Sequence, residues 1–370
     1  MASRRDVILG GLGLLASRAS NATAPLQQSA GPALIVRSMR PQNLETPVGL
    51  LDTDIVPVEA FFVRSHFGPP IIDEKSWRLS VTGQVDKTLS LTMDDLRKLP
   101  RVTSTSVLQC AGNGRALHRP RVAGAQWERG AVGQAKWTGV RLKDVLALAK
   151  PKSSARFVRL LGADSPPMPT TPQFARSVPL DKAMHAVSLL AHDMNDAPLH
   201  LLHGAPLRAV LPGWVGDDWI KWLVEIRVDD AEDAGFYQAT AYRMPRIDNT
   251  MAPMTSMVVK SLITKPTEAQ KLSTGPTAIT GIAFAGEDSV LRVEVSTDGG
   301  KTWANAALEK SAGLGAWQRW HVAWTPAPGS HRILARATDS KGHVQPEVTP
   351  WNPSGYLWNA IDAVTCEVSA

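Results

Sequence analysis

One cysteine stands where a strand-like segment meets a glycine-rich loop. The run from Thr105 to Gln109 indicates a strand, and Cys110 after it is followed by Gly112 and Gly114. Glycines allow the backbone to approach a bulky ligand closely, and a thiolate is a soft ligand for a transition metal. A single thiolate cannot complete a coordination sphere, so a metal at Cys110 would need a cofactor that brings further ligands. The alternative is that Cys110 is a small buried apolar side chain, and spacing alone leaves both open.

The chain has one further cysteine and a modest positive charge. Two cysteines in 370 residues exclude a disulfide-stapled scaffold, a four-cysteine zinc site and an iron–sulfur cluster. Cys366 lies in an apolar C-terminal segment, which indicates a buried core residue. The formal net charge is +6, but the basic residues form no Lys/Arg run, so we expect no nucleic-acid partner.

Residues 1–30 are typical of an export signal and its leader. Arg4 and Arg5 directly precede an apolar stretch at 7–16, which small residues follow at 22–24. That stretch is too short to cross a bilayer as a helix. The twin arginines resemble a Tat signal, and an ordinary Sec signal is the alternative. We therefore expect a Tat-exported periplasmic protein without a membrane span, and Tat export hints at a cofactor because it carries folded proteins.

The segment from 31 to 250 mixes short strands and short helices. The expected strands and helices include 77–83 and 155–160, and 91–99 and 140–149, respectively. Thr92 can cap the first of these helices. Because strands and helices do not alternate regularly, the pattern predicts an α+β domain and argues against a doubly wound sheet.

The segment from 251 to 370 follows a different pattern. Alternating runs occur at 290–296, 317–324 and 331–338, and Asp298-Gly299-Gly300 is a hairpin-turn signal. Several short strands with turn signals between them indicate an immunoglobulin-like β-sandwich. The stretch 242–256, which contains two prolines, is expected to be a linker loop.

Several short words of the sequence together resemble the sulfite oxidase family of molybdopterin enzymes. They are residues 61–66, 108–113, 203–208, 212–213, 215–216, 221–223, 345–346 and 351–352. The match runs from about residue 40 to the C-terminus, and the words are specific only in combination. The resemblance implies a mixed α/β molybdopterin-binding catalytic domain followed by an immunoglobulin-like dimerisation domain, and hence a homodimer.

The resemblance implies a molybdenum-dependent sulfite dehydrogenase that resembles the bacterial periplasmic enzymes. Cys110 would be the protein's thiolate ligand to molybdenum, and one molybdopterin would supply two more sulfurs. The reaction would be the two-electron oxidation of sulfite to sulfate. No Cys-x-x-Cys-His haem word occurs, so we expect no haem in this chain and a separate c-type cytochrome as the electron acceptor.

The resemblance also implies the residues that bind the substrate. Sulfite is a small dianion, which suits the permanently charged guanidinium group, and Arg64 and Arg115 match the family's anion-binding arginines. Tyr242 matches the active-site tyrosine, which can help to relay a proton; Tyr237 is its rival. Trp127 matches a tryptophan that walls the pocket, and plain core packing is its alternative role.

Cationic donors are expected around the cofactor because the pterin carries a phosphate tail. The residues at the family's cofactor positions are Arg64, Ser65, His66, Cys110, His203, Arg208 and Lys221.

Three positions depart from the family pattern. Ser65 stands where many members have asparagine, and Gly114 stands where the animal enzymes have a second arginine. Ser354 stands where animal and plant enzymes place an arginine from the second domain. Two other functions stay open: a periplasmic molybdoenzyme acting on another small oxyanion or a sulfoxide, and a non-enzymatic periplasmic binding protein with an immunoglobulin-like module. The two arginines argue against a sulfoxide, because a neutral substrate does not need them.

Overall fold

The structure is a computed structural model that describes residues 34–246, 248 and 250–370. The predicted export signal lies outside these residues. The described residues fall in one compact unit, so the predicted domain boundary near residue 250 stays a prediction. Among the described residues, no helix has the length and apolar character needed to cross a membrane.

The helices are few and short. The α-helices are α1 (Met93–Arg97), α2 (Leu142–Ala149), α3 (Leu180–Met184) and α4 (Phe236–Ala239). The 3-10 helices are η1 (Val48–Leu51), η2 (Val58–Ala60), η3 (Arg115–Leu117), η4 (Leu201–His203) and η5 (Gly216–Asp218). Helices α1 and α2 lie where periodicity predicted them. The first is shorter than predicted because a capping box between Thr92 and Asp95 fixes its start.

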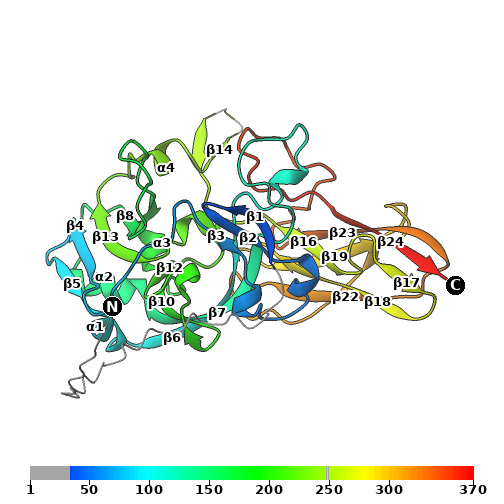
Figure 1. Ribbon diagram of the computed structural model, residues 1–370, viewed down its shortest axis with the longest axis horizontal. Helices are drawn as coiled ribbons and strands as arrows, with labels where there is room; N and C mark the ends of the chain where they lie inside the picture. Colours follow the sequence, from blue (N-terminus) through cyan, green and yellow to red (C-terminus); the bar gives the residue numbers. More distant parts are fainter. Residues whose placement is uncertain (1–33, 247, 249) are drawn as a thin grey trace, which may run out of the picture. The chain divides into compact units, whose positions relative to one another are not determined.

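Three sheets form before residue 250 (Figure 1). The first joins β1 (Ile35–Met39), β2 (Gln42–Glu45) and β3 (Val63–Arg64). The second has the order β11 (Ala197–Pro198), β10 (Leu189–Met194), β7 (Val132–Arg141) and β6 (Arg101–Gln109), with β12 (Arg208–Val210) paired to β10. The third has the order β5 (Leu89–Leu91), β4 (Leu79–Gly83), β13 (Leu223–Asp229), β8 (Phe157–Gly162) and β9 (Ala175–Pro179).

Strand directions confirm the predicted α+β class. In the third sheet β13 pairs in parallel with β4, whereas its pairing with β8 is antiparallel. Such a mixed sheet does not arise from regular βαβ repeats. Observed strands β4 and β8 overlap the predicted runs 77–83 and 155–160.

Strand β6 positions Cys110, which follows it directly. It pairs antiparallel with β7 over its whole length, and its last pair is Gln109 with Val132. Strand β7 is buried along most of its length, with Trp137 fully enclosed. Gly139 of β7 lies so close to β10 that a Cβ atom there would fall 1.9 Å from the Leu190 carbonyl oxygen. Cys110 therefore follows an edge strand that is held along its whole length by β7, which is itself paired to β10 on its other side.

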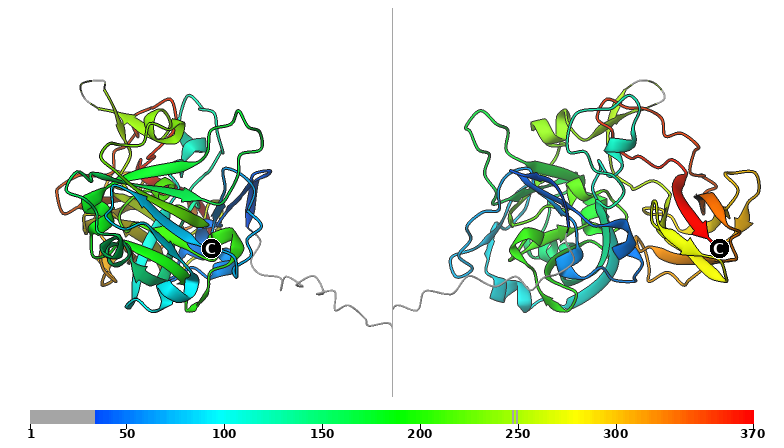
Figure 2. Two further views of the ribbon diagram at one scale, coloured as in Figure 1. Left: turned by 90° about the vertical axis from the view of Figure 1, so that its left-hand side faces the viewer. Right: turned by 45° about the vertical axis from the view of Figure 1, so that its right-hand side comes forward.

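After residue 250 the chain forms two facing sheets (Figure 2, yellow to red). One has the order β16 (Lys260–Lys265), β18 (Thr277–Phe284), β22 (Gln318–Trp324) and β21 (Ala307–Leu308). The other has the order β17 (Lys271–Ser273), β24 (Asp362–Ser369), β23 (Gly329–Asp339), β19 (Val290–Ser296) and β20 (Ala304–Asn305). Both sheets contribute to one apolar core, in which Ile263, Ile279, Val293 and Ile333 are fully buried. The sandwich is as predicted, and its immunoglobulin-like character stays a prediction.

The predicted linker is not an irregular loop. It contains a two-stranded antiparallel hairpin of β14 (Arg243–Pro245) and β15 (Met251–Pro253). The two prolines lie at the C-terminal ends of these strands, where the lost N–H group does little harm to an isolated ladder.

The loop between β23 and β24 returns to the loop that follows β6 (Figure 1). The Leu357 amide donates to the Ala111 carbonyl at 2.9 Å. The Ser354 carbonyl accepts a hydrogen bond from Arg115. The C-terminal segment therefore helps to build the surroundings of Cys110.

Candidate active site

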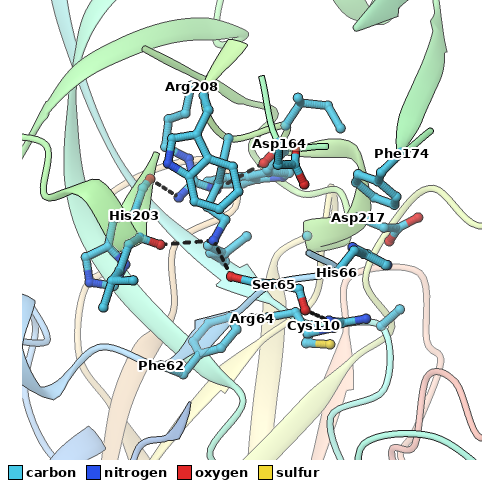
Figure 3. Close-up of a pocket in the computed structure, with 18 of the residues that line it drawn as sticks. Phe62, Arg64, Ser65, His66, Cys110, Asp164, Phe174, His203, Arg208 and Asp217 are labelled. Atoms are coloured by element: carbon cyan, nitrogen blue, oxygen red, sulfur yellow. Dashed lines mark hydrogen bonds between the residues drawn. The ribbon is translucent and has the colours of Figure 1, made fainter. Parts of the chain in front are cut away.

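A cavity of about 720 Å³ opens among the loops that follow the strands of the first three sheets. Its lining residues are Phe62, Arg64, Ser65, His66, Leu108, Cys110, Ala111, Asp164, Phe174, Leu202, His203, Arg208, Gly216, Asp217, Trp219, Ile220, Lys221, Trp222 and Tyr242. Figure 3 shows Cys110 and Arg64 at one end and Arg208 and His203 at the other. Eight of the ten predicted site residues are thus brought together.

Cys110 lies directly after β6, in a tight turn. The Asn113 amide donates to the Cys110 carbonyl at 2.9 Å, and Gly114 has a φ of 99°. A Cβ atom at Gly114 would fall 2.6 Å from Trp358, so the arginine expected there in animal enzymes has no room. Burial raises the pKa of the Cys110 thiol, while Arg64 and Arg115 favour the thiolate. These two cations are what a metal-ligating thiolate needs.

Cys366 differs in its surroundings. It is fully buried in the sandwich core. Burial raises the pKa of its thiol, and the acidic neighbours Glu367 and Glu268 raise it further. A thiol without a nearby cation is inert, in agreement with the predicted core role.

Three basic residues are buried at the end of the cavity away from Cys110. Arg208 donates to the carbonyls of His203 and Trp219, at 2.9 and 3.1 Å, and its Nε has no partner among the described residues. Burial lowers the pKa of Arg208 to about 9 and that of His203 to about 3. Burial also lowers the pKa of Lys221, whose ammonium donates to Ser65 Oγ at 3.1 Å.

Arg208 and Lys221 have no ion-pair partner in the described part of the chain, and His203 is neutral near pH 7 because of its lowered pKa. Their hydrogen-bond partners are carbonyls and one hydroxyl, and the rings of Trp137 and Trp222 lie under Arg208 and Lys221. Buried charges without counter-charges are costly. The orphaned Nε of Arg208 and the uncompensated charge therefore fit a group with an anionic tail, as a pterin phosphate would be.

The two predicted substrate arginines take different positions. Arg64 ends β3, lines the cavity and donates to the Ser65 carbonyl and to Asn43 Oδ1. Arg115 does not line the cavity: its Nε and Nη1 donate to the carbonyls of Ser354 and Ala125, both at 2.9 Å. Its guanidinium lies directly behind Gly112, where a Cβ atom would meet it at 2.6 Å.

Tyr242 lies at the Cys110 end and has a strained backbone, with a φ of 54°. Its hydroxyl lies 2.5 Å from His66 Nε2. Burial raises the pKa of Tyr242 and lowers that of His66 well below its ordinary value. Both groups are therefore neutral near pH 7, so the phenol can donate to a ligand or to the imidazole. Tyr237, the rival, is not among the lining residues.

Trp127 lies behind the lining of the cavity. It is fully buried and packs its ring edge-to-face on Phe62, with centroids 6.4 Å apart. Phe62 itself lines the cavity. Trp127 thus supports the wall, and its direct contact with substrate stays a prediction.

Sequence reasoning missed several residues around the cavity. Asp164 and Asp217 line it, and the Tyr356 ring stacks on Tyr242 with centroids 5.3 Å apart. Arg176 pairs with Asp217 at 3.2 Å and with Asp218 at 2.8 Å. The adjacent acids after Gly216 were the one visible signal, because two neighbouring carboxylates in an apolar stretch call for a buried cation.

Comparisons with known proteins agree with this picture. Residues 66–237 match the family model "Oxidoreductase molybdopterin binding domain", and residues 251–368 match "Mo-co oxidoreductase dimerisation domain". The chain is 38% identical to rat mitochondrial sulfite oxidase over 362 residues, which is 91% of this chain and 66% of that protein. It is 32% identical to Arabidopsis thaliana sulfite oxidase, with coverage of 89% and 93%.

A solved structure is similar over nearly the whole chain. The sulfane dehydrogenase SoxCD from Paracoccus pantotrophus matches with a TM-score of 0.79 and 28% identity, covering 94% of this chain and 90% of that chain. The similarity extends across both segments, because neither segment alone reaches that coverage.

Proposed function

The chain belongs to the sulfite oxidase family of molybdopterin oxidoreductases, and from that premise we propose that it oxidises sulfite to sulfate at a molybdenum-molybdopterin group. The chain spans about two thirds of the length of the mitochondrial relatives, 66% for the rat protein. The observation that carries the proposal is one cavity with a thiol at one end and, at the other, buried cations that have no ion-pair partner among the described residues.

In this proposal the chain holds the cofactor at two places. Cys110 supplies the thiolate ligand to molybdenum. Arg208, Lys221 and His203 hold the anionic tail, and Ser65 keeps the Lys221 ammonium in place at 3.1 Å. When bound, the group supplies a two-electron redox centre that transfers oxygen to the substrate.

The chain's other residues act on the substrate and on protons. Sulfite takes up one oxygen that comes from water, and the reaction releases two electrons and two protons. Arg64 attracts the anion, and Arg115 adds positive potential from behind Gly112. Tyr242 donates a hydrogen bond toward the reacting oxygen, and His66 orients that phenol at 2.5 Å.

The electrons need an acceptor, since two must leave after each turnover. We propose a separate c-type cytochrome in the periplasm, reached after Tat export. The segment 251–370 would join two copies of the chain in a homodimer, as the matched dimerisation-domain family suggests.

Metal analysis and steady-state kinetics test the proposal. Protein from molybdenum-replete cells should contain about one molybdenum per chain and oxidise sulfite with cytochrome c or ferricyanide. Cys110→Ser should abolish turnover and leave a folded protein, whereas the control Cys366→Ser should keep it. Wild-type rates in Cys110→Ser, or a well-folded protein without molybdenum, would refute the proposal.

A second candidate substrate is a sulfane sulfur compound, whose reacting group carries at most one negative charge. At the Cys110 end the cavity is lined by one arginine, Arg64, and one acid, Asp217, and the SoxCD match is a sulfane dehydrogenase. The discriminating measurement is kcat/KM for sulfite against glutathione persulfide, with the Cys110→Ser rate subtracted as background. A higher value for the persulfide would favour the second candidate.

A further inference from the structure

Arg176 of β9 is buried beside the cavity and plays no part in the predicted site. It is 1% exposed. Its Nε pairs with Asp218 at 2.8 Å, its Nη2 pairs with Asp217 at 3.2 Å, and its Nη1 donates to the Tyr237 carbonyl. One guanidinium thus joins β9 to η5 and to α4.

The same guanidinium lies over the Tyr242 ring, 5.5 Å from its centroid. Cation–π contacts of this kind are strongest when both groups are desolvated, as they are here. Tyr242 needs such support, because a non-glycine residue with a φ of 54° is held only when its surroundings fix it. Tyr356 stacks on the ring with an angle of 14° between the planes.

We propose that Arg176 is a positioning residue for the reaction: it fixes the Tyr242 ring so that the hydroxyl stays on His66. The inference rests on the proposed role of Tyr242 in sulfite oxidation. It also explains the two carboxylates, since Asp217 and Asp218 hold the guanidinium from the side of η5.

Arginine is suited to this place and lysine is not. The planar fork has donors in several directions, and all three of its nitrogens are used here. A lysine has one ammonium on a flexible stem and cannot reach both carboxylates and the Tyr237 carbonyl together. Arg176→Lys therefore keeps the charge and loses the geometry.

The first test compares Arg176→Lys with a matched control. Arg159→Lys is the control, because Arg159 also pairs with two acids, Glu225 at 2.7 Å and Asp233 at 3.0 Å, without touching the cavity. We expect Arg176→Lys to lower kcat for sulfite about 10- to 100-fold, with molybdenum content and KM little changed. Arg159→Lys should keep the wild-type kcat. Equal kcat values in the two variants would overturn the inference.

A double-mutant cycle separates positioning from general damage. If Arg176 acts through Tyr242, then Arg176→Lys should lower kcat only slightly further when Tyr242 has already been replaced by phenylalanine. The same loss in both backgrounds overturns the inference while the proposed function survives. A Tyr242→Phe variant with wild-type kinetics removes the role of the tyrosine and the inference with it, and leaves the Cys110 test of the function unaffected.

Two further measurements do not depend on turnover or on one variant. In a crystal structure of Arg176→Lys, the Tyr242 hydroxyl should move out of hydrogen-bond distance of His66 Nε2; an unmoved hydroxyl overturns the inference. If Arg176→Lys fails to fold, Asp218→Asn carries the test, since it removes only the 2.8 Å ion pair. It should lower kcat several-fold, and an unchanged kcat would overturn the inference.

Discussion

Two groups of buried charge lie around one cavity, and only one of them has acidic side chains beside its cation. Arg208 and Lys221 are surrounded by carbonyls, a hydroxyl and indole rings, with no acid at ion-pair distance in the described residues. Arg176 is equally buried but lies between Asp217 and Asp218. The first group leaves positive charge unpaired, and the second pairs its charge within the chain.

The difference separates binding from support. A buried cation without a counter-ion destabilises the empty protein and is stabilised when an anion binds. A buried cation between two acids gains nothing from a ligand and loses much if one partner is removed. Burial of a charged residue alone therefore does not identify a ligand site, whereas its missing partner does.

The largest expected effect comes from removing the cation of the paired group, which consists of Arg176, Asp217 and Asp218. Arg176→Met should lower the free energy of unfolding by about 3–5 kcal/mol, because it leaves the buried carboxylate of Asp218 without its cation, whereas burial already raises the pKa of Asp217 to about 8. Urea unfolding of cofactor-free protein measures this. The control Arg159→Met should lose less, since its partners Glu225 and Asp233 are 30% and 12% exposed. A stable Arg176→Met variant would contradict the distinction drawn between the two groups.

The next effect concerns Asp164, the acid that lines the cavity near Lys221. Burial raises the pKa of Asp164 from 3.8 to about 6. A carboxyl with a raised folded pKa stabilises the fold while protonated, and this contribution is lost as pH rises from about 4 to about 6. Two pKa units correspond to about 3 kcal/mol.

Asp164→Asn should therefore gain stability over the wild type by up to about 3 kcal/mol between pH 4 and pH 7, because the amide cannot ionise. Urea unfolding of the cofactor-free protein across this range is the measurement. Asp298→Asn is the control without a slope in this range, since hydrogen bonds from Thr302 and Ser296 lower the pKa of Asp298 and confine its pH-dependent contribution to below about pH 4. If the difference in free energy of unfolding between Asp164→Asn and the wild type does not change with pH, then Asp164 keeps an ordinary pKa.

How much of this could be read from the sequence differs between the two groups. The cofactor-end residues belong to short words such as 203–208 and 221–223, so the resemblance to the family was enough to place them at the expected cofactor site. The words do not predict that His203, in η4, and Lys221, before β13, share one cavity. That follows from the parallel pairing of β13 with β4 and from the β10–β12 pairing, which no local pattern encodes.

The group of Arg176, Asp217 and Asp218 could not be predicted, because its members also come together only through the tertiary structure. Arg176 and Asp218 are 42 residues apart, and nothing near either one marks the other. Arg115 shows the limit for a residue predicted from the family resemblance, because the Ser354 carbonyl, 239 residues away, fixes its direction away from the cavity lining. Periodicity predicted α2 and the strand at 290–296, because the 3.6-residue period of a helix and the two-residue period of a strand are visible in the local sequence.

The third prediction concerns the removal of a cation from the unpaired group, which consists of Arg208 and Lys221. Arg208→Met should weaken retention of the cofactor roughly 10- to 100-fold, because a hydrogen bond between charged groups contributes about 1.5–3 kcal/mol. Molybdenum content after prolonged dialysis measures the loss, with Arg159→Met as the control that keeps its metal. Cofactor-free Arg208→Met should be at least as stable as the cofactor-free wild type, the opposite sign to Arg176→Met. A destabilised variant with full molybdenum would make Arg208 a structural residue.

The smallest expected effect comes from a single hydroxyl. Ser65 Oγ accepts from Lys221 at 3.1 Å and is the side-chain atom that holds this ammonium. Ser65→Ala should weaken cofactor retention about fivefold, because one such hydrogen bond contributes about 1 kcal/mol. Ser80→Ala is the matched control, since Ser80 Oγ donates to the Val224 carbonyl at 3.2 Å outside the cavity. Equal molybdenum retention in both variants would mean that the Leu202 carbonyl, at 3.0 Å, positions Lys221 without help from Ser65.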